Sequence, residues 1–155
     1  FSHLSMPFKL NISEKNGKTW KLETSSEALI TRKLGETING KEISAELQGY
    51  EFKITGASDI AGFPQKSDIE GSELRRVLLT KGWGMHKRPR REGKKKRYTP
   101  RGLRLRKTVR GKQLSEKTVQ INLQVIKHGA TKLEAIFSDQ NKPKEQKAET
   151  APAAV

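Results

Sequence analysis

The sequence predicts a mainly β protein: a small antiparallel, barrel-like β domain with one or two short helices, a long basic loop and a disordered C-terminal tail. Three observations support this prediction. About five short segments alternate apolar and polar residues, as strands do. Asn-Gly pairs at 16–17 and 39–40 are typical of tight turns. A 38-residue basic segment at 75–112 is too long for an ordinary connection. Short antiparallel strands commonly curl or close to protect their edges, which favours the barrel-like arrangement.

The N-terminal third begins with a predicted hairpin. Residues 7–23 alternate apolar and polar side chains on both sides of the first Asn-Gly pair, the strongest short-range hairpin signal. In residues 24–30, helix-forming residues come after a serine, and this pattern predicts a helix of one or two turns. The second Asn-Gly pair leaves two alternatives open: a short hairpin around 39–40, or a helical turn at 44–47.

Four further elements follow along the chain. Strict alternation predicts strands at 50–55 and 119–125, and an apolar run predicts another at 76–80. Between the predicted strands at 50–55 and 76–80, residues 56–73 are dense in Gly, Ser, Asp and Pro, which is typical of an ordered loop. The apolar residues of 133–137 have a spacing that suits a helical turn at least as well as a strand.

The domain organisation is predicted from composition. Residues 1–6 are expected to be an N-terminal extension, and 7–137 a single β domain that includes the basic segment. Residues 138–155 have almost no apolar content and are expected to be a disordered tail. The absence of cysteine excludes disulfides, thiol catalysis and thiolate metal sites. We expect no membrane span and no signal peptide, because no long apolar run and no basic-then-apolar layout is present.

The positive charge is concentrated in one segment. The chain has 155 residues and a formal net charge of +15. Residues 75–112 contain 17 basic side chains and one acidic side chain, while 1–74 and 113–155 are nearly neutral. Such a block repels itself, so it is most easily maintained when a polyanion neutralises it. A disordered basic linker or a nuclear-import signal is the alternative interpretation.

The composition of the basic segment favours RNA over a simple charged linker. Glycines allow the backbone to approach phosphates, prolines lower the cost of ordering, and aromatic rings offer faces for unstacked bases. Trp83 could instead be a core or lid aromatic, and His86 is more simply a solvated or phosphate-contacting side chain than a catalytic one. The predicted RNA-binding residues combine these aromatic and cationic groups: Lys81, Trp83, His86, Lys87, Arg88, Arg90, Arg91, Lys94, Lys95, Lys96, Arg97, Tyr98, Arg101, Arg104, Arg106, Lys107, Arg110 and Lys112.

The end of the basic segment has strand character. Residues 103–110 alternate so that one face is mainly apolar, with Lys107 on it, and the other is mainly arginine. The second face carries Arg104, Arg106, Thr108 and Arg110. A strand with such a face could lie along a ridge of phosphates.

Signals for catalysis, metals and cofactors are absent. The sequence contains no phosphate-binding P-loop, no GxGxxG and no GxSxG motif, and its three histidines lack metal-ligand spacing. Turn chemistry explains Asp59, Asp68 and Glu70. We therefore expect no enzyme activity, no cofactor and no small-molecule substrate. Residues 87–102 have only Tyr98 as a bulky apolar group, which argues against a membrane-binding helix.

The order of several motifs resembles the archaeal and eukaryotic small-subunit ribosomal protein family S6e, and is closest to its short archaeal members. The resemblance covers roughly residues 6–137. It rests on KLNIS near the start, on ITGASD followed by GFP, on Lys81-Gly82, on the RPRR block, on Arg101-Gly102 and on the last strand with Lys127 and Gly129. Two positions depart from the family signature: Gln65 stands where Met is usual, and Ala57 stands where many members have Gly. We expect a polar Gln65 to fit poorly into an apolar pocket.

The resemblance implies a structural protein of the small subunit, located on the cytoplasmic ribosome. Its partners would be small-subunit ribosomal RNA and neighbouring ribosomal proteins, with the basic loop threading between RNA helices. The phosphorylated C-terminal helix of eukaryotic members has no counterpart in the Pro/Ala-containing tail, so kinase control is not carried over. A DNA-packaging or chromatin-type protein is the alternative. An enzyme acting on nucleic acid is a third reading, which lacks any nucleophile, base or metal constellation.

Overall fold

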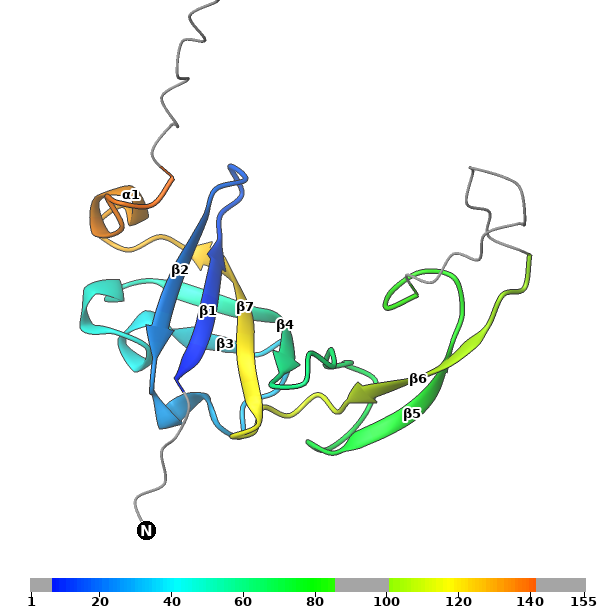
Figure 1. Cartoon of the computed structure of the whole chain (residues 1–155). Coiled ribbons are helices and arrows are strands. Elements are labelled where there is room, and N and C mark those ends of the chain that lie inside the picture. Colours follow the sequence, from blue (N-terminus) through cyan, green and yellow to red (C-terminus); the bar gives the residue numbers. More distant parts are fainter. Residues whose placement is uncertain (1–6, 86–100, 142–155) are drawn as a thin grey trace, which may run out of the picture.

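The computed structural model describes residues 7–85 and 101–141, which form a five-stranded sheet and a separate two-stranded ribbon (Figure 1). The sheet has the strand order β2-β1-β7-β4-β3, and the ribbon pairs β5 with β6. The strands are β1 (Phe8–Ser13), β2 (Thr19–Thr24), β3 (Thr37–Asn39), β4 (Glu51–Asp59), β5 (Leu74–Leu79), β6 (Leu105–Arg110) and β7 (Thr118–Lys127). The one α-helix of the described residues is α1 (Leu133–Ile136). The predicted mainly β class is confirmed.

The predicted hairpin at 7–23 is confirmed. Strands β1 and β2 pair antiparallel, with Ile12 opposite Trp20. Gly17 has a φ of 87°, a conformation that glycine adopts without steric cost, and its N–H donates to the Glu14 carbonyl. The turn chemistry therefore fixes the register that buries Ile12 and Trp20.

Strand β7 lies at the centre of the sheet and determines its topology. It pairs antiparallel with β4 and parallel with β1. The alternation that predicted this strand buries Ile121, Leu123 and Val125 against the core. The expectation of a purely antiparallel arrangement was wrong for the β1–β7 pair. The reason is that β7, the last strand in the sequence, inserts between β1 and β4.

The sheet does not close into a barrel, so the expected closure was wrong. Its two edges are protected in other ways. Strand β3 is only three residues long. Side-chain amides of the C-terminal segment pair with the free backbone of β2: Gln140 bonds both the N–H and the carbonyl of Lys21, and Asn141 donates to the Thr19 carbonyl. Short edge strands and covered edges prevent pairing with other chains without closure.

The helical predictions were confirmed only in part. The helix expected at 24–30 is a single 3₁₀ turn, Glu27–Leu29, and the Ser26 hydroxyl donates to the Glu42 carbonyl instead of capping it. The alternative of a helical turn after the second Asn-Gly pair is confirmed by 3₁₀ turns at Gly40–Glu42 and Ala45–Leu47. Helix α1 confirms the helical reading of 133–137.

Strand β4 extends further than the sequence suggested. Residues 56–59 were expected to belong to the loop, but they continue β4 to Asp59 and pair with β7. The register with β7 shifts between Glu51 and Phe52, between Ile54 and Gly56, and between Ser58 and Asp59, so the pairing is irregular at both ends and in the middle of β4. This extension carries Asp59 to the end of the sheet, beside the ribbon.

The core lies on one face of the five-stranded sheet and is closed by turns and by α1. Its largest fully buried side chains include Trp20, Tyr50, Phe52, Leu114 and Leu123. Tyr50 stacks on Phe52 with ring centroids 5.6 Å apart, and its hydroxyl donates to the Thr131 carbonyl. The core therefore holds the sheet independently of the ribbon, which extends away from it (Figure 1).

Two expected terminal segments lie largely outside the described residues. The predicted extension at 1–6 is outside them, as is most of the predicted tail. Residues 138–141, expected to belong to the tail, form a turn that contacts β2 through Gln140 and Asn141.

Candidate nucleic-acid interface

The β5–β6 ribbon displays two different faces. Strand partners share a face, so the register places Arg76 beside Thr108 and Leu78 beside Arg106 on one side. Arg76 and Arg106 are exposed on this outer face, together with Leu78 at 54%. The outer face thus combines arginines with apolar surface.

The other face of the ribbon is partly covered, from Leu79 near the tip to Val109 near the base. Leu79 and Val109 are buried there, with Val77, Leu105 and Lys107 partly buried. The chain after β5 folds back over this face, because the Lys107 ammonium donates to the Gly84 carbonyl at 3.2 Å. Lys107 therefore holds a turn in place with one of its donors.

A buried ion pair joins the ribbon to the sheet. The Arg110 Nε and Nη2 atoms donate to Asp59 Oδ2 at 3.1 and 2.9 Å, and Arg110 Nη1 donates to the Ser72 carbonyl at 2.7 Å. The side chains of Arg110 and Asp59 are 8% and 1% exposed. Asp59 Oδ1 also accepts the N–H of Phe63 at 2.7 Å. All three guanidinium nitrogens of Arg110 are thus engaged inside the protein.

The GFPQ loop forms the second connection between sheet and ribbon. The Gln65 N–H donates to the Ala57 carbonyl of β4, and the Arg110 N–H donates to the Pro64 carbonyl. The buried Gln65 side chain donates to Gln113 O at 3.4 Å and to Thr118 Oγ1 at 3.2 Å. Its Oε1 is buried with no hydrogen-bond partner among the described residues. The expected poor fit of Gln65 is therefore localised to one oxygen atom.

The segment after β6 is fixed by close backbone contacts. Gly111 N–H donates to the Glu73 carbonyl, and Lys112 N–H donates to the Ile69 carbonyl. The Lys112 ammonium pairs with Glu70, and this hydrogen bond lowers the pKa of the Glu70 carboxyl. The ribbon is consequently anchored at its base, while its tip points away from the sheet (Figure 1).

The structure separates the predicted site residues into groups. Lys81, Trp83, Arg101, Arg104 and Arg106 are exposed. Lys107 is partly buried, and Arg110 and Lys112 are paired with acidic residues. The remaining predicted residues lie outside the described part of the chain: His86, Lys87, Arg88, Arg90, Arg91, Lys94, Lys95, Lys96, Arg97 and Tyr98.

Two placements differ from the sequence interpretation. Arg110 does share a face with Arg106, but that face is buried at its end because the ribbon meets the sheet there. Asp59 was assigned to turn chemistry, which its bond with the Phe63 N–H bears out, but it is also the buried partner of Arg110. No pattern in the sequence pairs these two residues, which are 51 positions apart.

Sequence reasoning did not include Arg75 and Arg76 among the site residues. Both are exposed on β5, and Arg76 lies opposite Thr108 on the outer face with Arg106. Arg76 begins the run 76–80 that was interpreted as an apolar strand, and Arg75 immediately precedes it. Their position at the start of the basic segment 75–112 was the available signal, but only the register of β5 with β6 places Arg76 on the arginine face.

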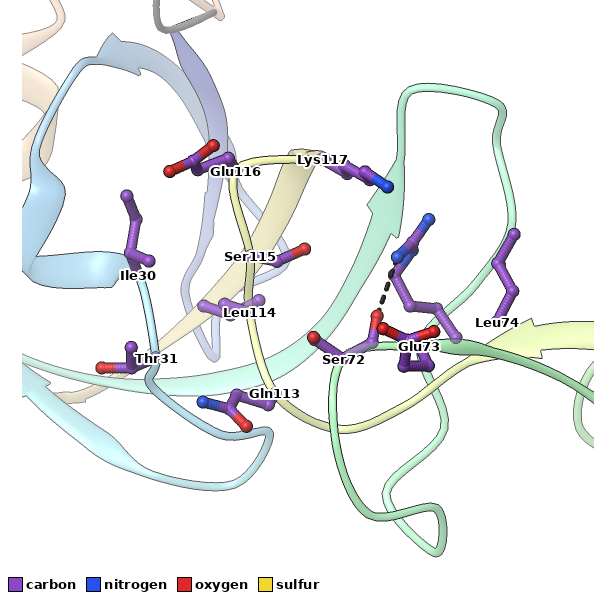
Figure 2. Close-up of a pocket in the computed structure, with 11 residues that line it drawn as sticks. Ile30, Thr31, Ser72, Glu73, Leu74, Gln113, Leu114, Ser115, Glu116 and Lys117 are labelled. Carbon is purple, nitrogen blue, oxygen red and sulfur yellow. Dashed lines mark hydrogen bonds between the residues drawn. The ribbon is translucent and has the colours of Figure 1, made fainter.

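A pocket of about 410 Å³ lies at the base of the ribbon (Figure 2). It is bordered by Ile30 and Thr31, by residues 72–74 and by 113–117. Figure 2 shows Glu73, Glu116 and Lys117 around it, so the lining carries charges of both signs. The bond from Arg110 to Ser72 crosses its wall. A lining of mixed sign does not favour a polyanion, in contrast to the outer face of the ribbon.

Two absences apply to residues 7–85 and 101–141 only. Within those ranges, no group of three or more potential metal ligands gathers. Within the same ranges, every helix is too short or too polar to cross a membrane.

Comparison with known proteins gives a consistent result. A family model described as ribosomal protein S6e matches residues 8–104 and 98–138. Small ribosomal subunit protein eS6 of Methanococcus maripaludis is 40% identical over 129 residues, which are 83% of this chain and 94% of that protein. The eS6 protein of Archaeoglobus fulgidus is 38% identical over 136 residues, with 85% and 96% covered. That of Nanoarchaeum equitans is 35% identical over 133 residues, with 84% and 90% covered.

Proposed function

Because the chain belongs to the ribosomal protein S6e family, a structural family of the small ribosomal subunit, we propose that it binds and stabilises ribosomal RNA there through residues 75–112. The β5–β6 ribbon and the cations between its strands form the RNA-facing element. The five-stranded sheet is the support that orients it. The protein domain is taken as residues 7–137.

The observation that carries this proposal is the location of the exposed cations. Residues 75–112 have 17 basic side chains and one acidic side chain. Of the described ones, Arg75, Arg76, Arg104 and Arg106 are exposed. Arginines offer planar donor forks that match phosphate geometry. A row of exposed arginines on a protruding ribbon suits an RNA surface whose phosphates lie on both sides of the ribbon.

The mechanism is phosphate neutralisation combined with shape fit. Base edges of RNA helices are hard to reach because the major groove is deep and narrow, so backbone contacts dominate. Release of counterions drives such binding and makes it salt-dependent. The apolar Leu78 on the outer face can cover sugar surface between the arginine contacts.

The first test replaces the outer-face arginines. The triple variant Arg76→Ala, Arg104→Ala and Arg106→Ala should bind small-subunit ribosomal RNA more weakly, and the slope of log affinity against log salt should become shallower by about 2–3. Circular dichroism should be unchanged, because these side chains are exposed. Filter binding at several salt concentrations measures the slope.

A matched control removes equal charge elsewhere. Lys9, Lys21 and Lys41 are exposed on the sheet side of the molecule, and their triple replacement by Ala should leave the slope nearly unchanged. Equal losses in both variants would show that net charge alone, and not the ribbon, drives binding. That result would contradict the proposal.

The same readout extends to the assembled subunit. Replacing Arg88, Arg90 and Arg91 with Ala should reduce incorporation into the small subunit on sucrose gradients. Normal occupancy of this variant would contradict the proposed role of residues 75–112. Competition between structured RNA and duplex DNA adds a second criterion: a preference for duplex DNA would instead indicate a DNA-packaging protein.

A further inference from the structure

A half-exposed tryptophan borders an apolar hollow next to the ribbon. Trp83 is 51% exposed, although it lies in a folded turn. The turn is held by the bond from Lys107 to the Gly84 carbonyl and by a Met85 N–H to Gly82 carbonyl bond of 3.2 Å. Gly84 has a φ of 71°, and a Cβ there would lie 3.1 Å from the Leu79 side chain. The backbone of this turn therefore packs against the ribbon, while the indole of Trp83 stays accessible.

The hollow beside Trp83 has a volume of about 460 Å³. Its wall is mostly apolar and comes from the GFPQ loop and the inner face of the ribbon: Phe63, Pro64, Leu79 and Val109. Lys107, which lies on the same face of the ribbon as Leu79 and Val109, adds an ammonium group to the lining. Binding sites commonly combine an apolar wall with a few polar groups in this way.

The same indole also borders a second hollow of about 490 Å³. That hollow is lined by both polar and apolar residues, including Lys53, Gln124 and the ion pair of Lys66 with Asp68. Trp83 therefore stands between an apolar hollow and a mixed one, to which Lys53 adds an ammonium group. The arrangement matches a nucleotide, which joins a flat apolar base to a charged phosphate.

We propose that the apolar hollow receives one unstacked nucleobase of RNA, which stacks on the indole of Trp83. The proposal rests on the RNA-binding function proposed above and names the recognition element within it. The neighbouring phosphates of that nucleotide lie against Lys107 and against Lys53 of the second hollow. Charge complementarity favours a nucleotide over an apolar protein side chain, because the segment around Trp83 is almost free of acidic residues.

Stacking explains why an aromatic ring remains exposed in a strongly cationic segment. A base stacked on an aromatic side chain contributes about 1–3 kcal/mol and depends little on base identity. The contact therefore fixes the position of an RNA strand without reading its sequence. The GFPQ loop, by forming part of the wall, connects the hollow to the sheet.

The first experiment identifies the occupant in the assembled particle. The photoreactive residue p-benzoylphenylalanine is introduced in place of Trp83 in the full chain, which is then assembled into small subunits and irradiated. The expected product is a crosslink to a nucleotide of ribosomal RNA. A crosslink to a ribosomal protein, or none at all, would overturn the proposal.

The second experiment tests the base itself. An RNA fragment containing the crosslinked nucleotide is compared with the same fragment carrying an abasic site at that nucleotide. The wild-type chain should bind the intact fragment about tenfold more tightly, and Trp83→Ala should abolish this difference while binding the abasic fragment unchanged. Trp83→Phe should keep most of the preference, because it retains a ring.

The controls separate this site from the general RNA interface. Ile126 is exposed to nearly the same extent as Trp83, at 50%, and Ile126→Ala should leave the base preference intact. Equal binding of intact and abasic fragments by the wild-type chain, with normal salt dependence, would contradict base binding in the hollow. The proposed RNA-binding function would still stand. Failure to bind either fragment would overturn both.

Discussion

Arg110 is a cation whose role is changed by burial. It belongs to the most basic part of the chain, yet all three of its guanidinium nitrogens donate to Asp59 and Ser72. A buried charge requires such partners, because leaving it unpaired in a low-dielectric environment costs several kcal/mol. Arg110 therefore serves to hold the ribbon on the sheet, while its exposed neighbour Arg106 remains available for a phosphate.

Removing the partner of Arg110 should unfold the junction. Asp59→Asn retains the shape of the side chain but leaves Arg110 without its counter-charge. We expect the free energy of unfolding to fall by about 3–5 kcal/mol, measured by urea denaturation. Glu51→Gln is the control, because Glu51 pairs with Lys127 at an exposed site and should change stability by less than about 1 kcal/mol. A loss at Asp59 no larger than in this control would refute the structural role.

Gln65 is a second residue whose polar side chain is buried. Its side-chain nitrogen donates to Gln113 and Thr118, while its oxygen is buried without a partner in the part of the chain that the structure describes. An unsatisfied buried acceptor costs about 1–3 kcal/mol. Thr118 Oγ1 also accepts the Ser115 N–H, so it keeps a partner if Gln65 is replaced.

The methionine typical of the family signature should fit this position better. Gln65→Met keeps an unbranched side chain of similar length and removes the unsatisfied oxygen. We expect the free energy of unfolding to rise by about 1 kcal/mol, seen as a higher urea midpoint with an unchanged m-value. A lower midpoint would mean that the bonds to Gln113 and Thr118 outweigh the orphan oxygen.

At the scale of elements, the ribbon depends on a tightly packed base. Ser72, the GFPQ loop and residues 111–114 meet there through backbone hydrogen bonds. Two strands alone are marginally stable in water, so β5 and β6 need these contacts to keep a fixed direction. The anchored base and the projecting tip together determine where the outer-face arginines are presented.

Gly111 tests this packing. A Cβ at Gly111 would lie 2.1 Å from the Gly71 carbonyl oxygen, a backbone atom that cannot easily move. Gly111→Ala should therefore lower the free energy of unfolding by about 2–3 kcal/mol, measured by urea denaturation. Gly56→Ala is the matched control, since the nearest atom to its Cβ would be 3.8 Å away and the cost should stay below that of Gly111→Ala. Similar losses in both variants would contradict the proposed close packing.

At the scale of the whole molecule, charge and core are separated in space. The apolar core lies on one face of the five-stranded sheet, and the exposed arginines lie on a ribbon that extends away from it (Figure 1). This separation allows the cations to be neutralised by a polyanion without disturbing the core. For the same reason, arginine variants on the ribbon should change RNA affinity, while packing variants at its base should change the free energy of unfolding.

The sequence was sufficient to predict most local elements. The hairpin at 7–23, the strand at 119–125 and the mainly β class followed from alternation and from Asn-Gly turn chemistry, which act between near neighbours. The helix at 24–30 was over-predicted because the Ser26 hydroxyl bonds a distant carbonyl. The length of β4 was underestimated because pairing with β7 overrides the turn-like composition of residues 56–59.

What the sequence determined by itself was a mainly β chain with one concentrated cationic segment, because periodicity and charge are read from consecutive residues. The tertiary structure decided the parallel β1–β7 pair, the open sheet and the division of the cations into exposed and buried groups. Those features depend on contacts such as Asp59 with Arg110, which join residues 51 positions apart. No local pattern encodes such pairings, since they arise only when the strands have been brought together.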